Sequence, residues 1–105
     1  MANDSTNELD ILKALANEKR LQILYWLKAP EQHFPPHQEV QGFDQGVCVT
    51  FIQAKLGLSQ AATSQYLTIL QKAGLVIPTR IGKFTYYRRN EQALAQFVAQ
   101  LQQTI

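Results

Sequence analysis

A run of amide and hydroxyl side chains recurs at helical spacing in the middle of the chain. Ser59 is suited to the N-cap of a helix and Gly74 to its C-terminal end, so the residues between them are predicted to form one helix. At 100° per residue, an arc of roughly 140° on this helix is polar. It contains Gln60, Ala61, Ser64, Gln65, Thr68, Gln71 and Lys72. Amides pair with adenine edges and hydroxyls bond donors or acceptors, so this arc favours contact with bases in a DNA major groove over a merely solvated helix face.

The charges are unevenly placed, although the formal net charge is only +2. All eight Asp and Glu residues lie outside the segment from Gln45 to Asn90. Six basic residues lie inside it: Lys55, Lys72, Arg80, Lys83, Arg88 and Arg89. A surface with basic side chains and no carboxylates is suited to binding a polyanion, because each contact with a phosphate releases condensed counterions. The alternative is a basic, solvated face without a partner.

The other reactive side chains are few. Cys48 is the only cysteine and has no resolving partner in the chain, so a buried structural thiol is favoured over a redox-active one. Pro35 and Pro36 lie between His33 and His37 and forbid the helix that would make them a metal-ligand pair. We expect solvated loop histidines, with a loop-borne zinc site as the alternative.

Catalysis is not expected. The chain has no Ser-His-Asp or Cys-His pairing, no paired carboxylate site and no glycine-rich phosphate loop. The sequence therefore predicts neither an enzyme nor a bound cofactor or metal.

Two helices are predicted before the basic segment. Ser5 and Glu8 have the spacing of a capping box, which would open the first helix. Asn17 is predicted to cap a second helix from Glu18 to about Lys28, which is apolar around much of its circumference and therefore central in the core.

A long loop and a helix-turn-helix follow. Pro30 to Gly46 contains three of the four prolines and is predicted to be an extended loop. Val47 to Leu56 is predicted to be a short helix that ends at Gly57. Gly57-Leu58-Ser59 then forms the tight corner before the polar-faced helix.

A β-hairpin is predicted next. Leu75 to Ile81 and Phe84 to Arg89 are rich in β-branched and aromatic residues, and Gly82-Lys83 between them indicates a two-residue turn. Pro78 predicts that the first strand is at an edge or is paired on only one side there. The basic residues expected to contact phosphates are Arg80, Lys83, Arg88 and Arg89. For Arg88 and Arg89 the alternative is strand-edge charges that only keep the hairpin soluble.

The last helix, residues 91–105, is predicted to begin after Asn90 and to mediate dimerisation. Its apolar stripe runs to the final residue, and the first helix has a matching stripe. The expected dimer interface comprises Leu9, Leu12, Leu94, Phe97, Val98, Leu101 and Ile105. The alternative is that the stripe packs entirely on its own domain.

Together these elements predict a mainly α fold with a small β-hairpin. It is a winged helix-turn-helix with a three-helix core plus a wing, dimerised through the terminal helices. Residues 1–105 are expected to form a single DNA-binding domain. The opening residues, MANDSTNELD, lack the order of an export signal and no apolar run could span a membrane, so we expect a cytoplasmic protein with no membrane partner.

Three segments resemble the winged-helix repressors of the ArsR (ArsR/SmtB) family: ALANEKRLQILYWL, LGLSQAATSQYLTILQKAGLV and RIGKFTYYRRN. The likeness covers about residues 9–100. It implies a cytoplasmic homodimer in which the first and last helices pair, bound to a palindromic double-stranded operator that an effector releases. It places the wing at Arg80 to Arg89. By position, the family's base-contacting residues fall on Gln60, Ala61, Ser64 and Gln65, with Thr68 beside them.

The chain departs from the family pattern at several points. Metal sensors of the family commonly carry Cys-x-Cys where this chain has VCVTF, and one thiolate is not a soft-metal site. A second metal site of the family uses acids and histidines on the last helix, and residues 92–105 contain neither. Ala61 replaces a common serine, so it could touch a thymine methyl but cannot donate a hydrogen bond. The loop from residue 30 to 46 is longer than the family's usual connection.

The sequence therefore predicts a sequence-specific, homodimeric repressor of the ArsR type that lacks the family's usual metal sites and whose effector is unknown. One alternative is a winged-helix module that binds protein rather than DNA. Another is an accessory DNA-binding protein without regulated release.

Overall fold

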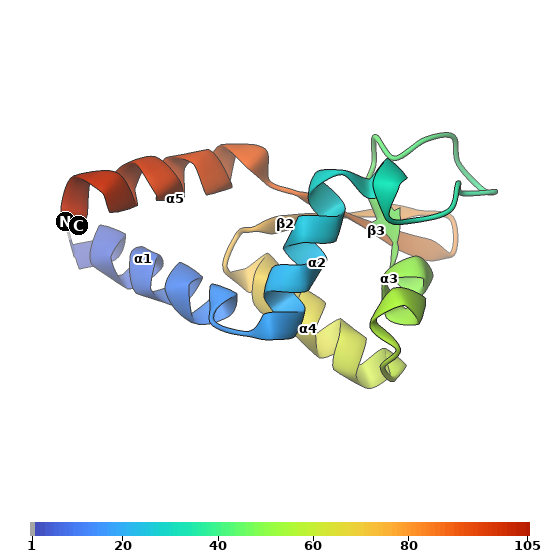
Figure 1. Ribbon diagram of the computed structural model, residues 1–105, viewed down its shortest axis with the longest axis horizontal. Helices are drawn as coiled ribbons and strands as arrows, with labels where there is room; N and C mark the ends of the chain where they lie inside the picture. The colour runs from blue at the N-terminus through green and yellow to red at the C-terminus, as the bar shows by residue number, and fades with distance from the viewer. Residues whose placement is uncertain (1) are drawn as a thin grey trace.

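The computed structural model describes residues 2–105, with side chains from Glu8 onward. Its elements in chain order are α1 (Ala2–Leu15), α2 (Glu18–Lys28), the 3-10 helix η1 (Pro30–Gln32), β1 (Val47–Cys48), α3 (Val49–Leu56), α4 (Gln60–Lys72), β2 (Val76–Ile81), β3 (Phe84–Arg89) and α5 (Glu91–Thr104). Figure 1 shows that α1 and α5 extend together to one end of the molecule, where both termini lie, with the sheet and α3 at the other end. The molecule measures 45 × 25 × 23 Å.

Helix α2 lies in the middle of the fold. Its Ile23, Leu24 and Leu27 are buried, and the helix contacts α1, α4 and β3. The side chain of Asn17 accepts a hydrogen bond from the backbone N of Arg20 at 3.0 Å. The predicted cap, bounds and central position of this helix are therefore confirmed.

The helix-turn-helix is formed by α3 and α4. Gly57 ends α3 in the left-handed conformation, with φ 69°, which a residue without a Cβ adopts at little cost. Ser59 then caps α4, because its Oγ accepts from the backbone N of Ala62 at 3.1 Å. The predicted corner between the two helices is confirmed.

The sheet has three antiparallel strands in the order β1-β3-β2. Ile81 pairs with Phe84 around Gly82-Lys83, which confirms the predicted hairpin, and β2 is an edge strand, as Pro78 predicted.

The prediction of a helix from Val47 was wrong in its first turn. Val47 and Cys48 form β1, which pairs with Tyr87 and Tyr86, and α3 begins only at Val49. The pairing gives β3 a partner along what would otherwise be an open edge. Because this partner lies about 40 residues away in the sequence, helical spacing alone does not reveal it.

The predicted start of the first helix was also wrong. α1 begins at Ala2, so Ser5 lies inside the helix rather than at its N-cap, and the Ser5 side chain is outside the described residues.

The loop from residue 30 to 46 folds back over the sheet through His37. A solvated side chain was predicted here, but the histidine is buried, with 8% of its surface exposed. Its Nε2 accepts from the backbone N of Cys48 at 3.1 Å, so the ring proton lies on Nδ1, which faces the carbonyl oxygen of Gly42 at 3.1 Å. The ring also stacks on Phe51 at 4.9 Å between centroids. The His37 ring therefore joins the loop to the start of α3.

Gly46 marks the closest approach of this loop to the wing. A Cβ at Gly46 would lie 2.3 Å from the carbonyl oxygen of Tyr87, and the residue has φ 107°. Gly42 has φ 68°, but a Cβ there would meet no atom within 4 Å. Only glycine at position 46 allows the loop backbone to lie against β3.

We predict that Gly46→Ala destabilises the fold by about 2–4 kcal/mol, since backbone strain and a main-chain clash add. Gly42→Ala is the matched control and should cost about 1 kcal/mol from its positive φ alone. Urea unfolding of the two variants tests this prediction. Equal losses in the free energy of unfolding would contradict the close approach of the Gly46 backbone to Tyr87.

Candidate nucleic-acid interface

The polar arc of α4 faces solvent as predicted. All seven of its members are exposed: Gln60, Ala61, Ser64, Gln65, Thr68, Gln71 and Lys72. On the other side of the helix, Thr63, Leu67 and Leu70 are fully buried. The hydroxyl of Thr63 donates to the backbone oxygen of Ser59 at 2.9 Å, so this buried polar group is satisfied within the helix.

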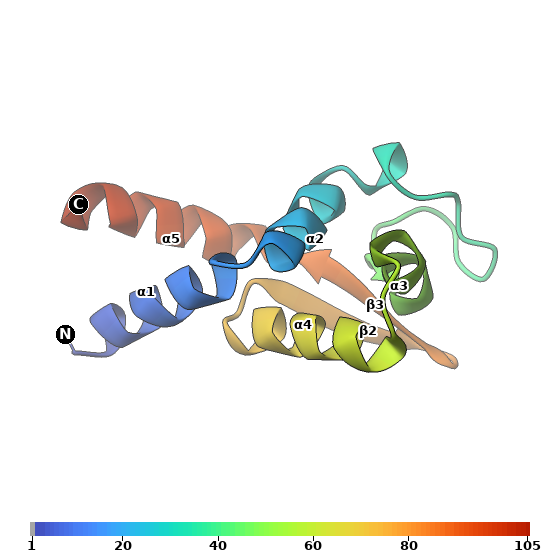
Figure 2. The same cartoon turned by 60° about the horizontal axis from the view of Figure 1, so that its bottom comes forward.

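The beginning of α4 and the wing enclose a groove. Gln60 and Ser64 of α4 line it on one side, and Arg80 and Lys83 of the hairpin line it on the other. Figure 2 shows that the free end of the hairpin and the start of α4 lie at the same end of the molecule. The groove therefore brings base-contacting chemistry and two cations together.

Helix α3 and strand β3 add residues to this groove that sequence spacing did not reveal. They are Val49, Thr50, Gln53, Phe84, Thr85 and Tyr87. Thr50 and Gln53 are three apart on α3 and so share a helix face, which is the one signal in the sequence that could have indicated them. Burial raises the pKa of Tyr87 above its ordinary value of 10.0, so its phenol stays neutral and can donate a hydrogen bond.

The cations at this groove are free of carboxylates. Arg80 is exposed, and its Nε donates to the backbone oxygen of Gly82 at 3.1 Å, within the same hairpin. Lys83 at the turn is also exposed. Neither residue takes part in an ion pair among the residues the structure describes. Both side chains therefore keep their charge for a polyanion.

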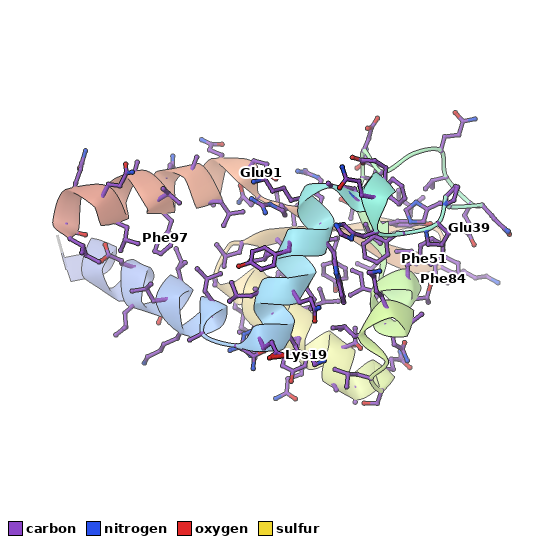
Figure 3. The ribbon with its side chains drawn as sticks, viewed as in Figure 1. Lys19, Glu39, Phe51, Phe84, Glu91 and Phe97 are labelled. Carbon is purple, nitrogen blue, oxygen red and sulfur yellow. The ribbon has the colours of Figure 1, made fainter. Side chains whose placement is uncertain are left out.

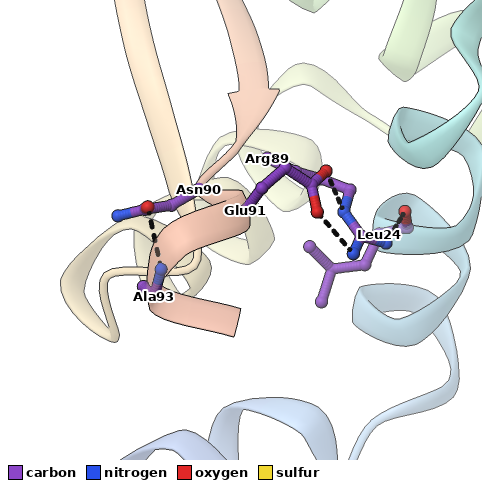
Figure 4. Close-up of polar contacts among 5 residues, drawn as sticks. All are labelled: Leu24, Arg89, Asn90, Glu91 and Ala93. Carbon is purple, nitrogen blue, oxygen red and sulfur yellow. Dashed lines mark hydrogen bonds and ion pairs between the residues drawn. The ribbon is translucent and has the colours of Figure 1, made fainter. Parts of the chain in front are cut away.

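Arg89 was expected to contact phosphate, and the structure places it elsewhere. Its Nε lies 2.9 Å from Oε2 of Glu91, and its Nη2 donates to Oε1 of the same carboxylate at 3.1 Å, as Figure 4 shows. Its Nη1 donates to the backbone oxygen of Leu24 in α2 at 3.3 Å. Only 14% of the Arg89 side chain is exposed. We therefore remove Arg89 from the candidate interface.

Arg88 is exposed, is not among the residues that line the groove, and lies on the opposite face of β3 from Thr85 and Tyr87. The register pairs Arg80 with Thr85, and side chains alternate along a strand, so Thr85 and Tyr87 share the groove face. Arg88 shares instead the face of Tyr86, which is fully buried and in edge contact with the ring of His37. Of the four basic wing residues that were predicted, Arg80 and Lys83 adjoin α4.

Burial also affects Tyr86. Its burial, together with the nearby Cys48 and Glu39, raises the pKa of the Tyr86 hydroxyl above 10.0. The group is therefore neutral at physiological pH and belongs to the core beneath the loop.

The residues expected at the dimer interface divide into two groups. Leu9, Leu12, Val98 and Ile105 are exposed, with 52%, 38%, 52% and 91% of their surface accessible. Phe97 is 6% exposed and belongs to the protomer's own core. Figure 3 shows it pointing from α5 toward α1. Its helical spacing matched the stripe, but its side chain packs in the core cluster of its own chain.

Leu94 and Leu101 lie between these two groups. They are half-buried and pack against the core. Leu94 also adjoins Val98 in a shallow groove on the outer side of α5, and Leu101 adjoins Ile105 in a second one.

Cys48 and the histidines form no metal cluster in the described part of the chain. The Cys48 thiol is buried, as predicted, and its Sγ lies 3.2 Å from the hydroxyl oxygen of Thr50. Among the side chains from Glu8 to Ile105, no group of three or more His, Cys, Asp or Glu residues could hold a metal ion.

No described helix has the length and apolarity needed to cross a membrane.

Comparisons with known proteins agree with this geometry. Residues 44–77, which include α3 and α4, match the model of the "Bacterial regulatory protein, arsR family". The chain is 52% identical over 88 residues to an uncharacterized HTH-type transcriptional regulator, YbzH, of Bacillus subtilis, covering 84% of this chain and 88% of that protein. The chain belongs to the ArsR family of bacterial regulatory proteins.

Two other similar proteins extend the comparison. The transcriptional activator HlyU of Vibrio cholerae is 33% identical over 87 residues, which cover 83% of this chain and 67% of that protein. A solution structure from Mycobacterium bovis, described as a homodimeric winged helix-turn-helix DNA-binding domain, aligns with a TM-score of 0.68 and 29% identity over 93% of this chain and 78% of that one. The chain is thus a transcriptional regulator and not an enzyme, and its predicted winged helix-turn-helix fold is confirmed.

Arg88 and Arg89 provide a test of their different surroundings. We predict that Arg89→Ala lowers the free energy of unfolding by about 1–2 kcal/mol, because it removes hydrogen bonds to Glu91 and α2. Arg88→Ala removes the same charge from an exposed site and should change stability by less than about 0.5 kcal/mol. Thermal unfolding measures both, and equal effects would place Arg89 in solvent.

Proposed function

We propose that the chain is a homodimeric repressor that binds a palindromic DNA operator through α4 and the wing. The observation that carries this proposal is the carboxylate-free groove in which Gln60 and Ser64 adjoin Arg80 and Lys83. Amides and hydroxyls contact base edges, and the two cations contact phosphates. Such a repressor acts in the cytoplasm, with the DNA it binds.

The base-contacting residues are assigned to the exposed arc of α4. They are Gln60, Ala61, Ser64, Gln65 and Thr68. Ala61 has no polar group, so its contribution is apolar contact with a thymine methyl. Gln65 lies in the middle of this helix face. Its side chain has the length and the amide group needed for a bidentate pair with adenine.

The second copy is proposed to dock on the outer faces of α1 and α5. Leu9, Leu12, Val98 and Ile105 are large apolar side chains left exposed in the single chain. The similar domain from Mycobacterium bovis is described as homodimeric, which supports the same assembly here. In this dimer, residues 1–105 act as one DNA-binding domain and residues 91–105 as its dimerisation helix. Two α4 helices then enter successive major grooves about 34 Å apart.

The proposal predicts different effects for two substitutions at the DNA face. Gln65→Ala should cost about 1–3 kcal/mol on the preferred duplex and relax selectivity at one base pair, because it removes a base contact. Lys83→Ala should weaken binding to all DNA sequences alike, because it removes a phosphate contact. The slope of the logarithm of the binding constant against the logarithm of salt concentration should fall in magnitude by about 1. Fluorescence anisotropy on a duplex selected by the protein from a random pool, and on its scrambled form, separates the two.

Arg88→Ala is the control for Lys83→Ala. It removes an equal, exposed charge from a residue that does not line the groove, and we expect a smaller change in affinity. An equal loss for both would show that the wing meets DNA in another orientation. Binding by the wild-type protein that is indifferent to sequence would remove the claim of a specific operator.

The dimer face makes a separate prediction. Val98→Glu should raise the dimer dissociation constant by at least about 100-fold, because it replaces a buried methyl contact with a charge in an apolar interface. Gln96→Glu adds the same charge at an exposed position about 160° away around α5 and should leave the dimer intact. Sedimentation velocity over a concentration series measures both, and a dimer that persists in Val98→Glu contradicts this interface.

A further inference from the structure

Asn90 joins the end of α4 to the start of α5. Its backbone N donates to the carbonyl oxygen of Leu75 at 2.9 Å, and its side-chain Nδ2 donates to that of Gly74 at 3.0 Å. Its Oδ1 accepts from the backbone N of Ala93 at 3.1 Å and so caps α5 (Figure 4). One residue therefore bonds both the turn that ends α4 and the first turn of the terminal helix.

The turn that Asn90 holds is itself tightly attached to α4. Gly74 has φ 79° and its backbone N donates to Gln71, while the backbone N of Leu75 donates to Leu70 at 3.0 Å. Leu75 is fully buried. Because this turn is bonded to the last turn of α4, a shift of Gly74 relative to α5 is also a shift of α4 relative to α5.

The start of α5 is held on its other side by Arg89 and Glu91. Their ion pair, together with the bond from Arg89 to Leu24, connects the start of α5 to the central helix α2. The two sets of bonds therefore leave α5 little freedom to pivot at its N-terminal end. The exposed apolar residues Val98 and Ile105 lie toward its far end.

We propose that Asn90 is a positioning residue that sets the half-site spacing recognised by the dimer. This inference rests on the proposed function, in which α5 joins the two copies and α4 contacts the bases. In such a dimer the angle between α5 and α4 within each chain determines the distance and rotation between the two α4 helices. The Nδ2 bond of Asn90 to Gly74 restricts that angle.

The capping and bridging roles of Asn90 can be separated. Serine also caps helices well, so Asn90→Ser keeps the acceptor for Ala93, but its hydroxyl is too short to reach Gly74 as well. Asn17 is the matched control, because its Oδ1 caps α2 by accepting from Arg20 and its side chain has no other hydrogen bond among the described residues. Asn17→Ser therefore makes the same chemical change at a cap without a bridge.

The experiment compares wild type, Asn90→Ser and Asn17→Ser on three duplexes. One is selected by the wild-type dimer from a random pool, and the others have one base pair inserted or deleted between its half-sites. One base pair displaces a half-site by about 3.4 Å along the DNA, so wild type and Asn17→Ser should each lose about 10-fold or more in affinity on the altered duplexes. Asn90→Ser should lose less than about threefold, because the α4 helices can then adjust to either spacing.

Two further measurements exclude a general loss of structure. Sedimentation velocity should show that all three proteins remain dimers, and thermal unfolding should show how much stability each substitution removes.

Asn90→Asp is a second variant. It retains the size of the side chain and the helix cap but sets a carboxylate oxygen against the Gly74 carbonyl oxygen, and it should lose the spacing preference in the same way.

The outcomes distinguish this inference from the function on which it rests. A wild-type protein with a clear spacing preference that Asn90→Ser and Asn90→Asp retain overturns the positioning role alone, even if both variants are less stable. A wild-type dimer that selects no duplex overturns the proposed function and the spacing role with it. Loss of the preference in Asn17→Ser as well would show that it reflects general stability and would also overturn the inference.

Discussion

The packing of α4 against the centre of the fold is the contact on which the rest of the structure depends. Thr63, Leu67 and Leu70 are buried on one side of this helix, and α2 lies against it. Burial of these residues removes apolar area from water, which stabilises the fold by about 25 cal/mol for each Å². Because that side must face inward, the amide and hydroxyl side must face outward. The same contact that stabilises the domain therefore exposes the surface proposed to contact DNA.

The wing depends on the sheet in a comparable way. A hairpin of two strands is marginal in water on its own. Here β3 is paired on both sides, and the loop that precedes β1 covers its outer face through His37. Gly46 allows the loop backbone to lie directly against Tyr87. The loop from residue 30 to 46 thus supports the wing, and the two groove-facing cations project from a well-supported strand pair.

Much of the fold follows from local signals. The caps at Asn17, Ser59 and Asn90, together with the glycines at 57 and 74, predicted where helices begin or end, because capping involves groups only a few residues apart. The exposed arc of α4 was predicted for the same reason, since its periodicity is contained within one helix. β1 was missed because its partner strand lies far away in the sequence. The early start of α1 was missed because Ser5 and Glu8 have the spacing of a capping box, although the helix already begins at Ala2.

The candidate site divides along the same line. The sequence by itself determined the helix-turn-helix, the polar face of α4 and the carboxylate-free segment, all of which are properties of spacing and composition. Only the tertiary structure decided which basic side chains remain available to contact DNA. Arg89 bonds to Leu24, 65 residues away, Arg88 lies on the opposite face of β3 from Tyr87, and Arg80 adjoins α4. Four similar cations have different surroundings because strand alternation and long-range packing, rather than residue type, determine what each side chain can reach.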